Sequence, residues 1–164
     1  MIPEPYIAFR NSLSVAEASI GYDGITLFPI ESLSENQVGY SHTLAGESLC
    51  LGGAGDWREE WLVIGQSLAC GDPIILDTAE EQLPILSALH GEGSWNPTSI
   101  AGSLEGFAIA YNLLVALGHG RENPIALSKK PLPAEMRLKA LNEIELHNPG
   151  VIMYFWALLF PENE

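Results

Sequence analysis

The sequence predicts an α+β domain with a central, mostly antiparallel sheet packed by helices and a helical C-terminal extension. Short apolar stretches bounded by turn residues cluster in the middle of the chain, whereas stretches with helical periodicity lie toward both ends. Hydrophobic residues make up 47% of the 164 residues and charged residues 17%, which favours a packed core over disorder or a coiled coil. We expect one domain over residues 1–164, with its core at about 5–118 and the extension at 119–164.

The N-terminal part of the chain predicts a helix followed by a turn and a strand. Pro5 suits a first helical turn, and apolar residues then recur at helical spacing, namely Tyr6, Phe9, Leu13, Ala16 and Ile20. Glycines and an aspartate in residues 21–24 predict a turn. The apolar stretch Ile25–Phe28 is short and stops at Pro29, which favours a strand over a helix.

The middle of the chain predicts a short helix, a loop and three strands. Serine caps followed by a glycine indicate a helix at about 32–39, and the glycine-rich stretch 41–56 predicts a loop. Three apolar stretches predict strands, namely Trp61–Ile64, which Gly65 ends, Ile74–Leu76 and Ile85–Leu89. The turn signal Gly71-Asp72-Pro73 lies between the first two stretches, so we expect them to form an antiparallel hairpin.

The last third of the chain predicts three helices. The first begins within residues 98–103 and ends at Gly118, because its apolar residues follow helical spacing. The second begins after Pro131 and is expected to bury Ala134, Leu138, Leu141 and Ile144. The third begins near Asn148-Pro149 and carries the apolar run Val151–Phe160. A helix that is apolar on all sides must be buried, either in this subunit or against a partner.

The charge of the chain narrows the class of partner. The net charge is −14, and residues 11–120 contain fourteen acids and a single base, Arg58. An acidic segment of this kind repels phosphate backbones and anionic lipid surfaces, so we expect neither nucleic-acid nor membrane binding. A basic protein partner and simple solubility both remain as explanations.

The processing signals predict a cytoplasmic protein. Residues 2–5 contain two prolines and no basic or apolar region typical of a signal peptide. The longest apolar run, 151–160, is half of the roughly 20 residues that a membrane-spanning helix needs. Cys50 and Cys70 are the only cysteines, and two thiols in a chain of this size do not indicate a disulfide framework.

A nucleophilic serine and a metal site are the two candidate catalytic centres. The stretch Gly65-Gln66-Ser67-Leu68-Ala69 is close to the nucleophile elbow G-x-S-x-G, but the elbow needs a helix next, and residues 70–73 are turn formers. The histidines lack the short spacing of metal ligands, and with the aspartates nearby they form only a scattered set, namely His42, His90, His119, His147, Asp56, Asp72 and Asp77. Turn and cap roles explain these residues at least as well, so we expect no catalytic set, no metal and no other cofactor.

Glutamates and tryptophans on the predicted loops are candidate binding residues. Five glutamates could act as paired acid–base carboxylates, as partner contacts or as a solvated surface, namely Glu59, Glu60, Glu80, Glu81 and Glu92. Trp57, Trp61 and Trp95 flank the glycine-rich stretch. Three tryptophans in this position suit the edge of a packed core and equally an anchor for a protein partner.

Four segments in the middle of the chain form one pattern, namely Trp61–Gly65, Gly71–Asp77, Trp95–Pro97 and Ile100–Phe107. This pattern resembles the SUKH superfamily, and more narrowly its Smi/Knr branch, named for a fungal regulator of cell-wall glucan synthesis. The stretches Ile25–Phe28 and Gly39-Tyr40 match weakly, so that the resemblance covers 6–107. The family motif residues here are chiefly structural, namely Trp61, Gly65, Gly71, Asp72, Asp77, Trp95 and Phe107. The chain after Gly118 has no counterpart in the family pattern.

The resemblance implies a binding function rather than catalysis. Bacterial members are widely regarded as immunity proteins that neutralise toxins, often nucleases or deaminases, whereas fungal members are scaffolds in cell-wall signalling. We therefore predict a bacterial immunity-type protein that blocks a basic toxin domain, with Glu59, Glu60, Glu80, Glu81 and Glu92 as candidate contacts.

The alternative is a regulatory or scaffold protein of the Smi/Knr type without a toxin partner. Such a protein could form a homodimer through the last helix, because the apolar surface of that helix needs a cover. Its interface would consist of Val151, Tyr154, Phe155, Trp156 and Leu159.

Overall fold

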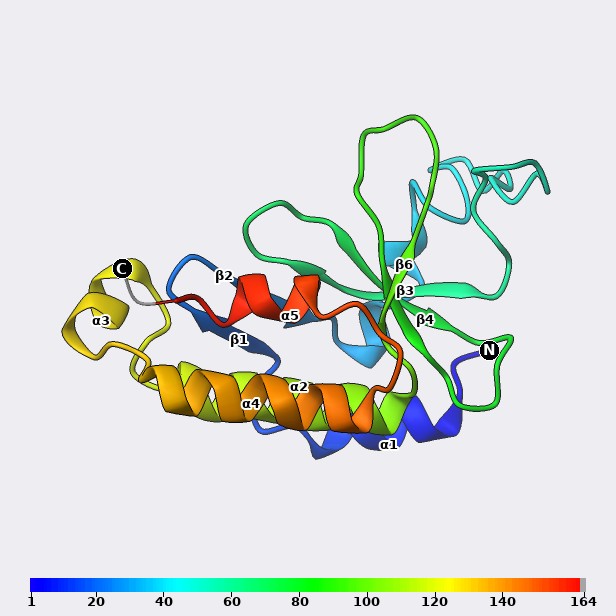
Figure 1. Cartoon of the computed structure of the whole chain (residues 1–164). Helices are drawn as coiled ribbons and strands as arrows, with labels where there is room; N and C mark the ends of the chain where they lie inside the picture. The colour runs from blue at the N-terminus through cyan, green and yellow to red at the C-terminus, as the bar shows by residue number, and fades with distance from the viewer. Residues whose placement is uncertain (163–164) are drawn as a thin grey trace.

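The structure, a computed structural model, describes residues 1–162 and contains one six-stranded sheet (Figure 1). The strands lie across the sheet in chain order, and all neighbouring pairs are antiparallel. They are β1 (Glu17–Ile20), β2 (Asp23–Leu27), β3 (Trp61–Ser67), β4 (Pro73–Asp77), β5 (Ile85–Ser87) and β6 (Thr98–Ala101). The predicted α+β class with a mostly antiparallel central sheet is confirmed.

Helices cover one face of this sheet and irregular loops cover the other. The described residues form α1 (Glu4–Ser12), α2 (Leu104–Gly118), α3 (Pro124–Lys129), α4 (Ala134–His147), α5 (Tyr154–Leu159) and two 3-10 helices, η1 (Ile30–Ser32) and η2 (Glu35–Gln37). In Figure 1, α1, α2 and α4 lie together on one side of the sheet. The long connections 38–60 and 88–97 extend on the other side.

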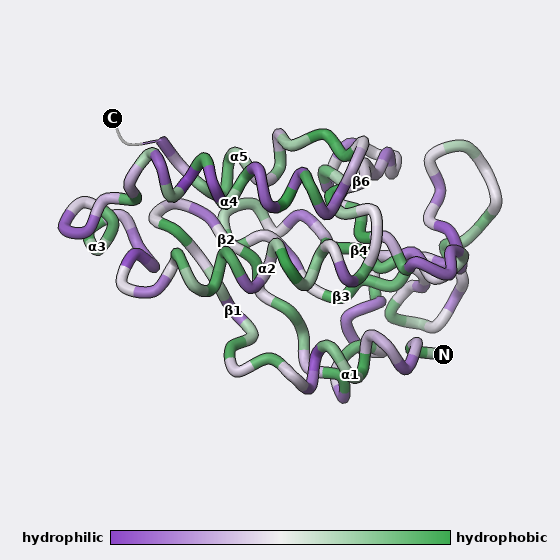
Figure 2. Tube along the Cα trace, turned by 60° about the horizontal axis from the view of Figure 1, so that its bottom comes forward, coloured by the Kyte–Doolittle hydropathy of each residue, from purple (hydrophilic) through white to green (hydrophobic). Residues whose placement is uncertain are grey.

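The main hydrophobic core lies on the helix face, which we define as the side of the sheet formed by Leu27, Ile64, Ile74, Leu76 and Ile85. The helices fill it with Phe107, Ala110, Tyr111, Leu114, Ile144, Trp156 and Phe160. Hydrophilic and hydrophobic residues alternate along α4 in Figure 2, as expected for a helix with one buried side. The indole N–H of Trp156 donates to the backbone carbonyl of Ile100 at 2.7 Å, which joins α5 to β6.

The first helix is shorter than predicted, because a strand replaces its second half. The helix ends at Ser12, and Glu17–Ile20 forms β1, so the predicted helical positions of Ala16 and Ile20 are wrong. The hairpin between β1 and β2 explains this outcome: Gly21 adopts a φ of 67°, which permits a tight turn. Likewise, two 3-10 helices stand where the sequence predicts one short helix.

The central hairpin is confirmed, but the strand boundaries differ from the prediction. Trp61 pairs with Asp77 across the hairpin of β3 and β4. Gly65 does not end β3, which continues to Ser67 because both β2 and β4 pair with it there. The third predicted strand is β5, which ends at Ser87. β6 occupies residues 98–101, where the sequence predicts the start of a helix.

The C-terminal helices belong to the main core and are not an appended extension. Leu132, Ala140, Ile144 and residues of α5 lie in the same buried cluster as α2. The predicted buried side of α4 is correct in part: Ile144 is buried and Leu141 is half-buried against the core, whereas Ala134 and Leu138 are exposed and Ala140 is buried instead. The short helix α3 is not predicted at all.

The apolar C-terminal run divides between core and surface. α5 begins at Tyr154, later than predicted, and Trp156 and Leu159 are buried within this chain. These two residues therefore cannot form the predicted homodimer interface, because their side chains already pack against the sheet. Tyr154 is 70% exposed, while Phe155 and Val151 are half-buried.

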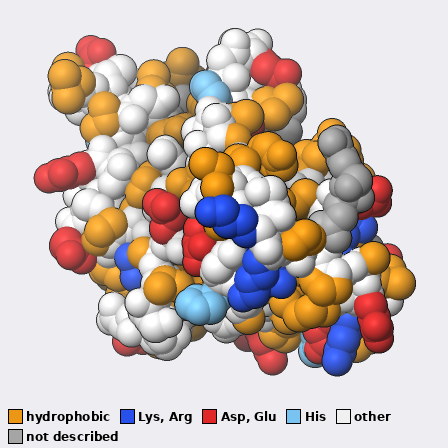
Figure 3. Space-filling view, turned by 90° about the vertical axis from the view of Figure 1, so that its left-hand side faces the viewer, with side chains coloured by type: hydrophobic (Ala, Val, Ile, Leu, Met, Phe, Trp, Pro, Cys, Tyr) orange, Lys and Arg blue, Asp and Glu red, His pale blue; other side chains and the backbone are white. Residues whose placement is uncertain are grey.

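The end of the molecule that carries α3 differs in charge from the rest. Residues 121–164 contain five bases and six acids, in contrast to the strongly acidic segment 11–120. Figure 3 shows Lys and Arg side chains among hydrophobic ones at this end. The exposed side chains there include Ile125, Lys129 and Lys130.

Candidate functional site

A second, smaller hydrophobic cluster lies on the opposite side of the sheet, here called the loop face and formed by Trp61, Val63 and Ile75. Trp57 is at the centre of this cluster. Its ring centroid lies 5.0 Å from that of Tyr40, 5.1 Å from that of Trp95 and 5.4 Å from that of Trp61. Side chains from two loops and one strand therefore meet as a group of four aromatic rings, the aromatic cluster.

The glutamine of η2 fixes the edge of this cluster. Gln37 is buried, and its amide both donates to the carbonyl of Val63 and accepts from the N–H of Val63, each at 2.9 Å. β2 pairs with β3 only from Gly65 to Ser67, so on that side the backbone of Val63 has no strand partner. The side chain of Gln37 provides the hydrogen-bond partner instead.

Two hydrogen bonds to backbone carbonyls hold the loops over the sheet. The indole N–H of Trp57 donates to the carbonyl of Trp61 at 3.0 Å, and the backbone N–H of Trp95 donates to the carbonyl of Gly55 at 2.7 Å. The loop 88–97 therefore lies directly against the glycine-rich loop. Trp57 and Trp61 are buried and Trp95 is half-buried, so they form the edge of a core, with Trp95 at its margin.

Asp72 and His90 tie the loop 88–97 to the turn after β3. One carboxylate oxygen of Asp72 accepts from the backbone N–H of His90 at 3.0 Å and lies 2.6 Å from its Nδ1.

Burial, together with the negative charge of Asp72, raises the pKa of Tyr40 above its ordinary value. The aromatic cluster therefore holds Tyr40 as the neutral phenol.

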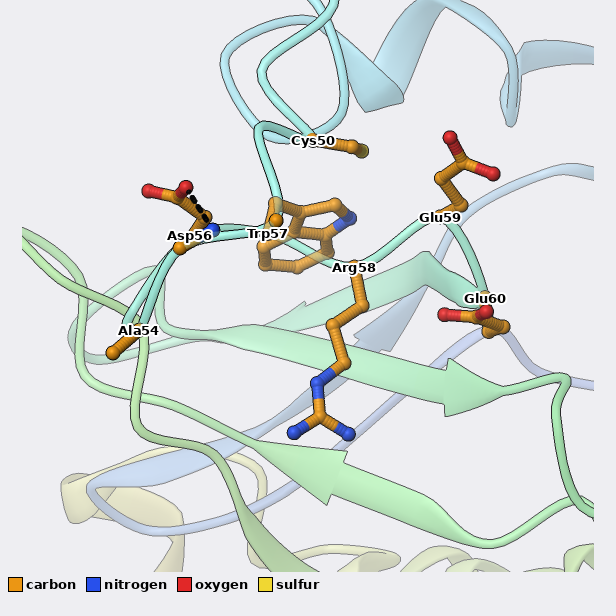
Figure 4. Close-up of a pocket in the computed structure, with 9 residues that line it drawn as sticks. Cys50, Ala54, Asp56, Trp57, Arg58, Glu59 and Glu60 are labelled. Carbon is orange, nitrogen blue, oxygen red and sulfur yellow. Dashed lines mark hydrogen bonds between the residues drawn. The ribbon is translucent and has the colours of Figure 1, made fainter.

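A shallow groove passes the aromatic cluster along residues 50–60 (Figure 4). One part has a volume of about 430 Å³ and is lined by Cys50, Gly52, Gly53, Ala54, Asp56, Trp57, Arg58, Glu59 and Glu60. The adjoining part has a volume of about 690 Å³ and adds Trp61, Asp77 and Trp95. Both parts share Asp56 and Arg58, so the Arg58 side chain lies where they meet. In Figure 4, Asp56 and Glu59 lie on opposite sides of Trp57, and Arg58 extends across the strands.

The groove carries excess negative charge that no contact neutralises. Four carboxylates line it, from Asp56, Glu59, Glu60 and Asp77, and Arg58 is its only base. The Arg58 guanidinium carbon lies 5.1 Å from the ring centroid of Trp61, in a cation–π arrangement. Within residues 1–162, the side chains of Arg58, Glu59 and Glu60 make no hydrogen bond or ion pair. The groove can therefore attract a cationic group.

The structure brings four of the five candidate glutamates to one end of the strands β3 and β4, where Trp61 pairs with Asp77. Thr78 donates from its N–H and its hydroxyl to the carbonyl of Glu60, at 2.9 Å and 2.8 Å. The loop that carries Glu80 and Glu81 thus begins beside Glu60. Glu92 lies on the loop 88–97, at the opposite end of β4, because Ser87 pairs with Ile74. All five side chains are exposed, namely those of Glu59, Glu60, Glu80, Glu81 and Glu92.

The residues that carry the resemblance to the SUKH superfamily stabilise strand pairing, turns and the core. A Cβ at Gly65 would collide with the carbonyl of Thr26, so only glycine allows β2 and β3 to pair there. Gly71 adopts a φ of 74° in the turn before Asp72. Asp77 accepts from the N–H of Ala79 at 3.0 Å, and Phe107 is buried on the helix face.

Ser67 and His90 both lie against Asp72, but within residues 1–162 the Ser67 hydroxyl makes no hydrogen bond to a histidine. Ser67 is buried, and its hydroxyl accepts from the backbone N–H of Asp72 at 3.2 Å rather than from a histidine. The residue after it enters a turn, not a helix. In the part of the chain that the structure describes, no group of three or more His, Cys, Asp or Glu side chains converges on a metal-binding geometry.

Two residues of the aromatic cluster and the groove, Tyr40 and Arg58, are not predicted as site residues from the sequence, and Asp56 is predicted only as part of a scattered metal set. Tyr40 carries no local signal, because only the fold brings it to the tryptophans. Arg58 has one: it is the only base in residues 11–120, and it stands next to Trp57.

Comparison of the chain with protein-family models, with curated proteins and with solved structures finds no significant match. None of the helices within residues 1–162 has the length and apolar character needed to cross a bilayer.

Proposed function

We propose that this chain is a non-enzymatic, cytoplasmic protein-binding module whose loop-face groove receives a basic protein. The observation that carries the proposal is the groove itself, which Trp61 and Trp95 line together with the carboxylates of Asp56 and Asp77, and which continues past Glu59 and Glu60. Tryptophan and arginine are the residue types that dominate binding energy at protein interfaces. Exposed carboxylates of one sign accelerate encounter with a basic partner and disfavour acidic ones.

The partner that fits best is a toxin domain, which makes the chain an immunity-type protein. The resemblance of residues 6–107 to the SUKH superfamily supports this assignment, as does the acidic segment 11–120. A nuclease needs a basic surface to hold phosphates, and an acidic groove competes for the same surface. Binding alone is sufficient to block such an enzyme, so no catalytic group is required.

Co-expression of this chain with each protein encoded beside its gene tests the proposal. We expect one of these proteins to be basic, to co-purify with the full chain and to lose its toxicity when the chain is present. The double variant Glu59→Gln/Glu60→Gln should weaken the complex about ten-fold at low salt, mainly through slower association. The matched control is Glu135→Gln/Glu145→Gln on α4, which removes equal charge elsewhere. Equal loss in both double variants, or no basic partner among the neighbours, would contradict the proposal.

A homodimeric scaffold is the second candidate, and the exposed apolar residues at the C-terminus favour it. Ile152, Tyr154 and Leu158 are exposed on and just before α5. Sedimentation of the full chain and of Tyr154→Ser/Leu158→Ser separates the two candidates. A dimer that this double variant converts to a monomer supports the scaffold, and a monomer in both cases refutes it.

A further inference from the structure

We infer that the face of Trp61 covered by Arg58 is a guanidinium-binding site, and that an arginine side chain of the basic partner replaces Arg58 there. The inference rests on the proposed function, since it names the chemical group that enters the groove. It goes further by assigning one ring as the receptor and one residue of this chain as the occupant that must leave.

The cation–π attraction at the Trp61 ring would become stronger if an arginine of the partner replaced Arg58. The guanidinium carbon lies 5.1 Å from the ring centroid, within the range of cation–π attraction. Arg58 is exposed, so water screens this attraction. An arginine delivered by a protein surface would be desolvated on the same ring, where the attraction is stronger.

Within the described residues, displacement of the Arg58 side chain breaks no hydrogen bond and no ion pair. The guanidinium lines the same groove as Asp56 and Asp77. An incoming guanidinium can donate to these carboxylates while it stacks on the Trp61 ring, because its N–H groups lie in the plane of the guanidinium and point outward. A lysine ammonium offers no such plane, so the site should prefer arginine.

The shape of the groove agrees with a removable Arg58. Its two parts, of about 430 Å³ and about 690 Å³, share Arg58 among their lining residues. Rotation of this side chain into solvent would uncover the ring face. Trp61 itself cannot follow, because it is 7% exposed and its carbonyl holds the indole N–H of Trp57.

The test uses a defined small probe, N-acetylarginine methylamide, with the full chain and the variant Arg58→Ala. The indole N–H cross-peak of Trp61, assigned with Trp61→Phe, reports binding in a nitrogen–proton correlation spectrum. We expect saturable shifts of this peak in Arg58→Ala, with a dissociation constant about ten-fold lower than in the unmodified chain, where Arg58 competes intramolecularly. The lysine control Lys139→Ala, which removes a cation from α4, should behave like the unmodified chain.

The citrulline counterpart of the probe has the same shape without the charge and should not shift the Trp61 peak. Equal shifts from both probes, equal affinity in the unmodified chain and Arg58→Ala, or absence of any shift would each overturn the inference. Asp77→Asn in the Arg58→Ala background keeps the ring in place and should weaken probe binding. These outcomes are separate from the proposed function: a toxin captured through Glu59 and Glu60 without a guanidinium response would leave that function standing and refute only this site.

Discussion

The two faces of the sheet are built from similar residues but are closed in different ways. On the helix face, four helices of the chain cover the strands, and Trp156 is sealed with its indole N–H bonded to β6. On the loop face, the aromatic cluster is covered only by loops, and its rings line an open groove. Tryptophan is thus buried beneath helices on one face, whereas on the other face Trp57 and Trp61 are buried beneath loops and Trp95 is half-buried.

This difference separates stability from recognition. The helix face carries most of the buried apolar area, which is the dominant favourable term in folding. The loop face carries the unpaired carboxylates and the Arg58–Trp61 contact, which contribute little to folding because they are exposed. Substitutions on the helix face should therefore change mainly stability, and substitutions on the loop face mainly binding.

The largest effect is expected for Trp156→Ala on the helix face. Trp156 is fully buried, and its removal leaves a cavity and an unpaired carbonyl at Ile100. We expect the free energy of unfolding to fall by about 4 kcal/mol, measured by urea denaturation. Tyr154→Ala, two residues away and exposed, is the matched control and should change stability by less than about 0.5 kcal/mol. A comparable loss in both variants would mean that the C-terminal run is covered by a partner.

A buried asparagine gives the next largest effect and tests how the C-terminal helices join the core. Asn148 is fully buried, accepts from the N–H of Gly102 at 3.0 Å, and donates to the carbonyls of Gly106 and Ile144 at 3.2 Å and 2.9 Å. Asn148→Leu leaves these groups unpaired, so we expect a loss of about 3 kcal/mol in urea denaturation. Asn112→Leu, on the exposed side of α2, should be nearly neutral. A small loss at Asn148 would show that water replaces its bonds.

A smaller effect is expected on the loop face, for Gln37→Leu. The substitution removes the two bonds between the Gln37 amide and the backbone of Val63. We expect a loss of about 2 kcal/mol, together with a change in tryptophan fluorescence from the aromatic cluster. Gln82→Leu, an exposed glutamine after β4, is the control and should change neither quantity. An unchanged fluorescence spectrum in Gln37→Leu would mean that the loops hold the cluster without η2.

The sequence predicts much of the helix face and little of the loop face, for a physical reason. Periodicity records which residues are buried by regular elements, and the spacing of Leu104, Phe107, Tyr111 and Leu114 predicts α2 correctly. Periodicity carries no information on long-range pairing. β1 and β6 are therefore missed, since their strand conformation depends on β2 and β5 beside them.

The candidate site shows the same limit. Trp57, Trp61 and Trp95 are recognisable from residue type alone, and so is the isolated charge of Arg58. The contact that brings the rings together is formed by loops, whose path depends on a backbone bond from Trp95 to Gly55 and on the amide of Gln37. Neither bond leaves a sequence pattern, because both involve backbone groups.

The smallest effect on stability, and the sharpest test of the comparison, is expected for His90→Ala. His90 is 53% exposed on its side chain, so loss of its contact with Asp72 should lower the free energy of unfolding by only about 0.5 kcal/mol. The loop 88–97 should nevertheless open more often, because within residues 1–162 the backbone N–H of His90 and the bond from Trp95 to Gly55 are then its hydrogen bonds to the neighbouring loops, beside the ring contacts of Trp95. Hydrogen exchange at the Trp95 N–H should therefore accelerate while that of the Trp156 indole N–H stays unchanged. His119→Ala, at the exposed end of α2, should change neither rate. Acceleration at both tryptophans of His90→Ala would mean that the two faces open together, and that the loop face is not a separately mobile surface.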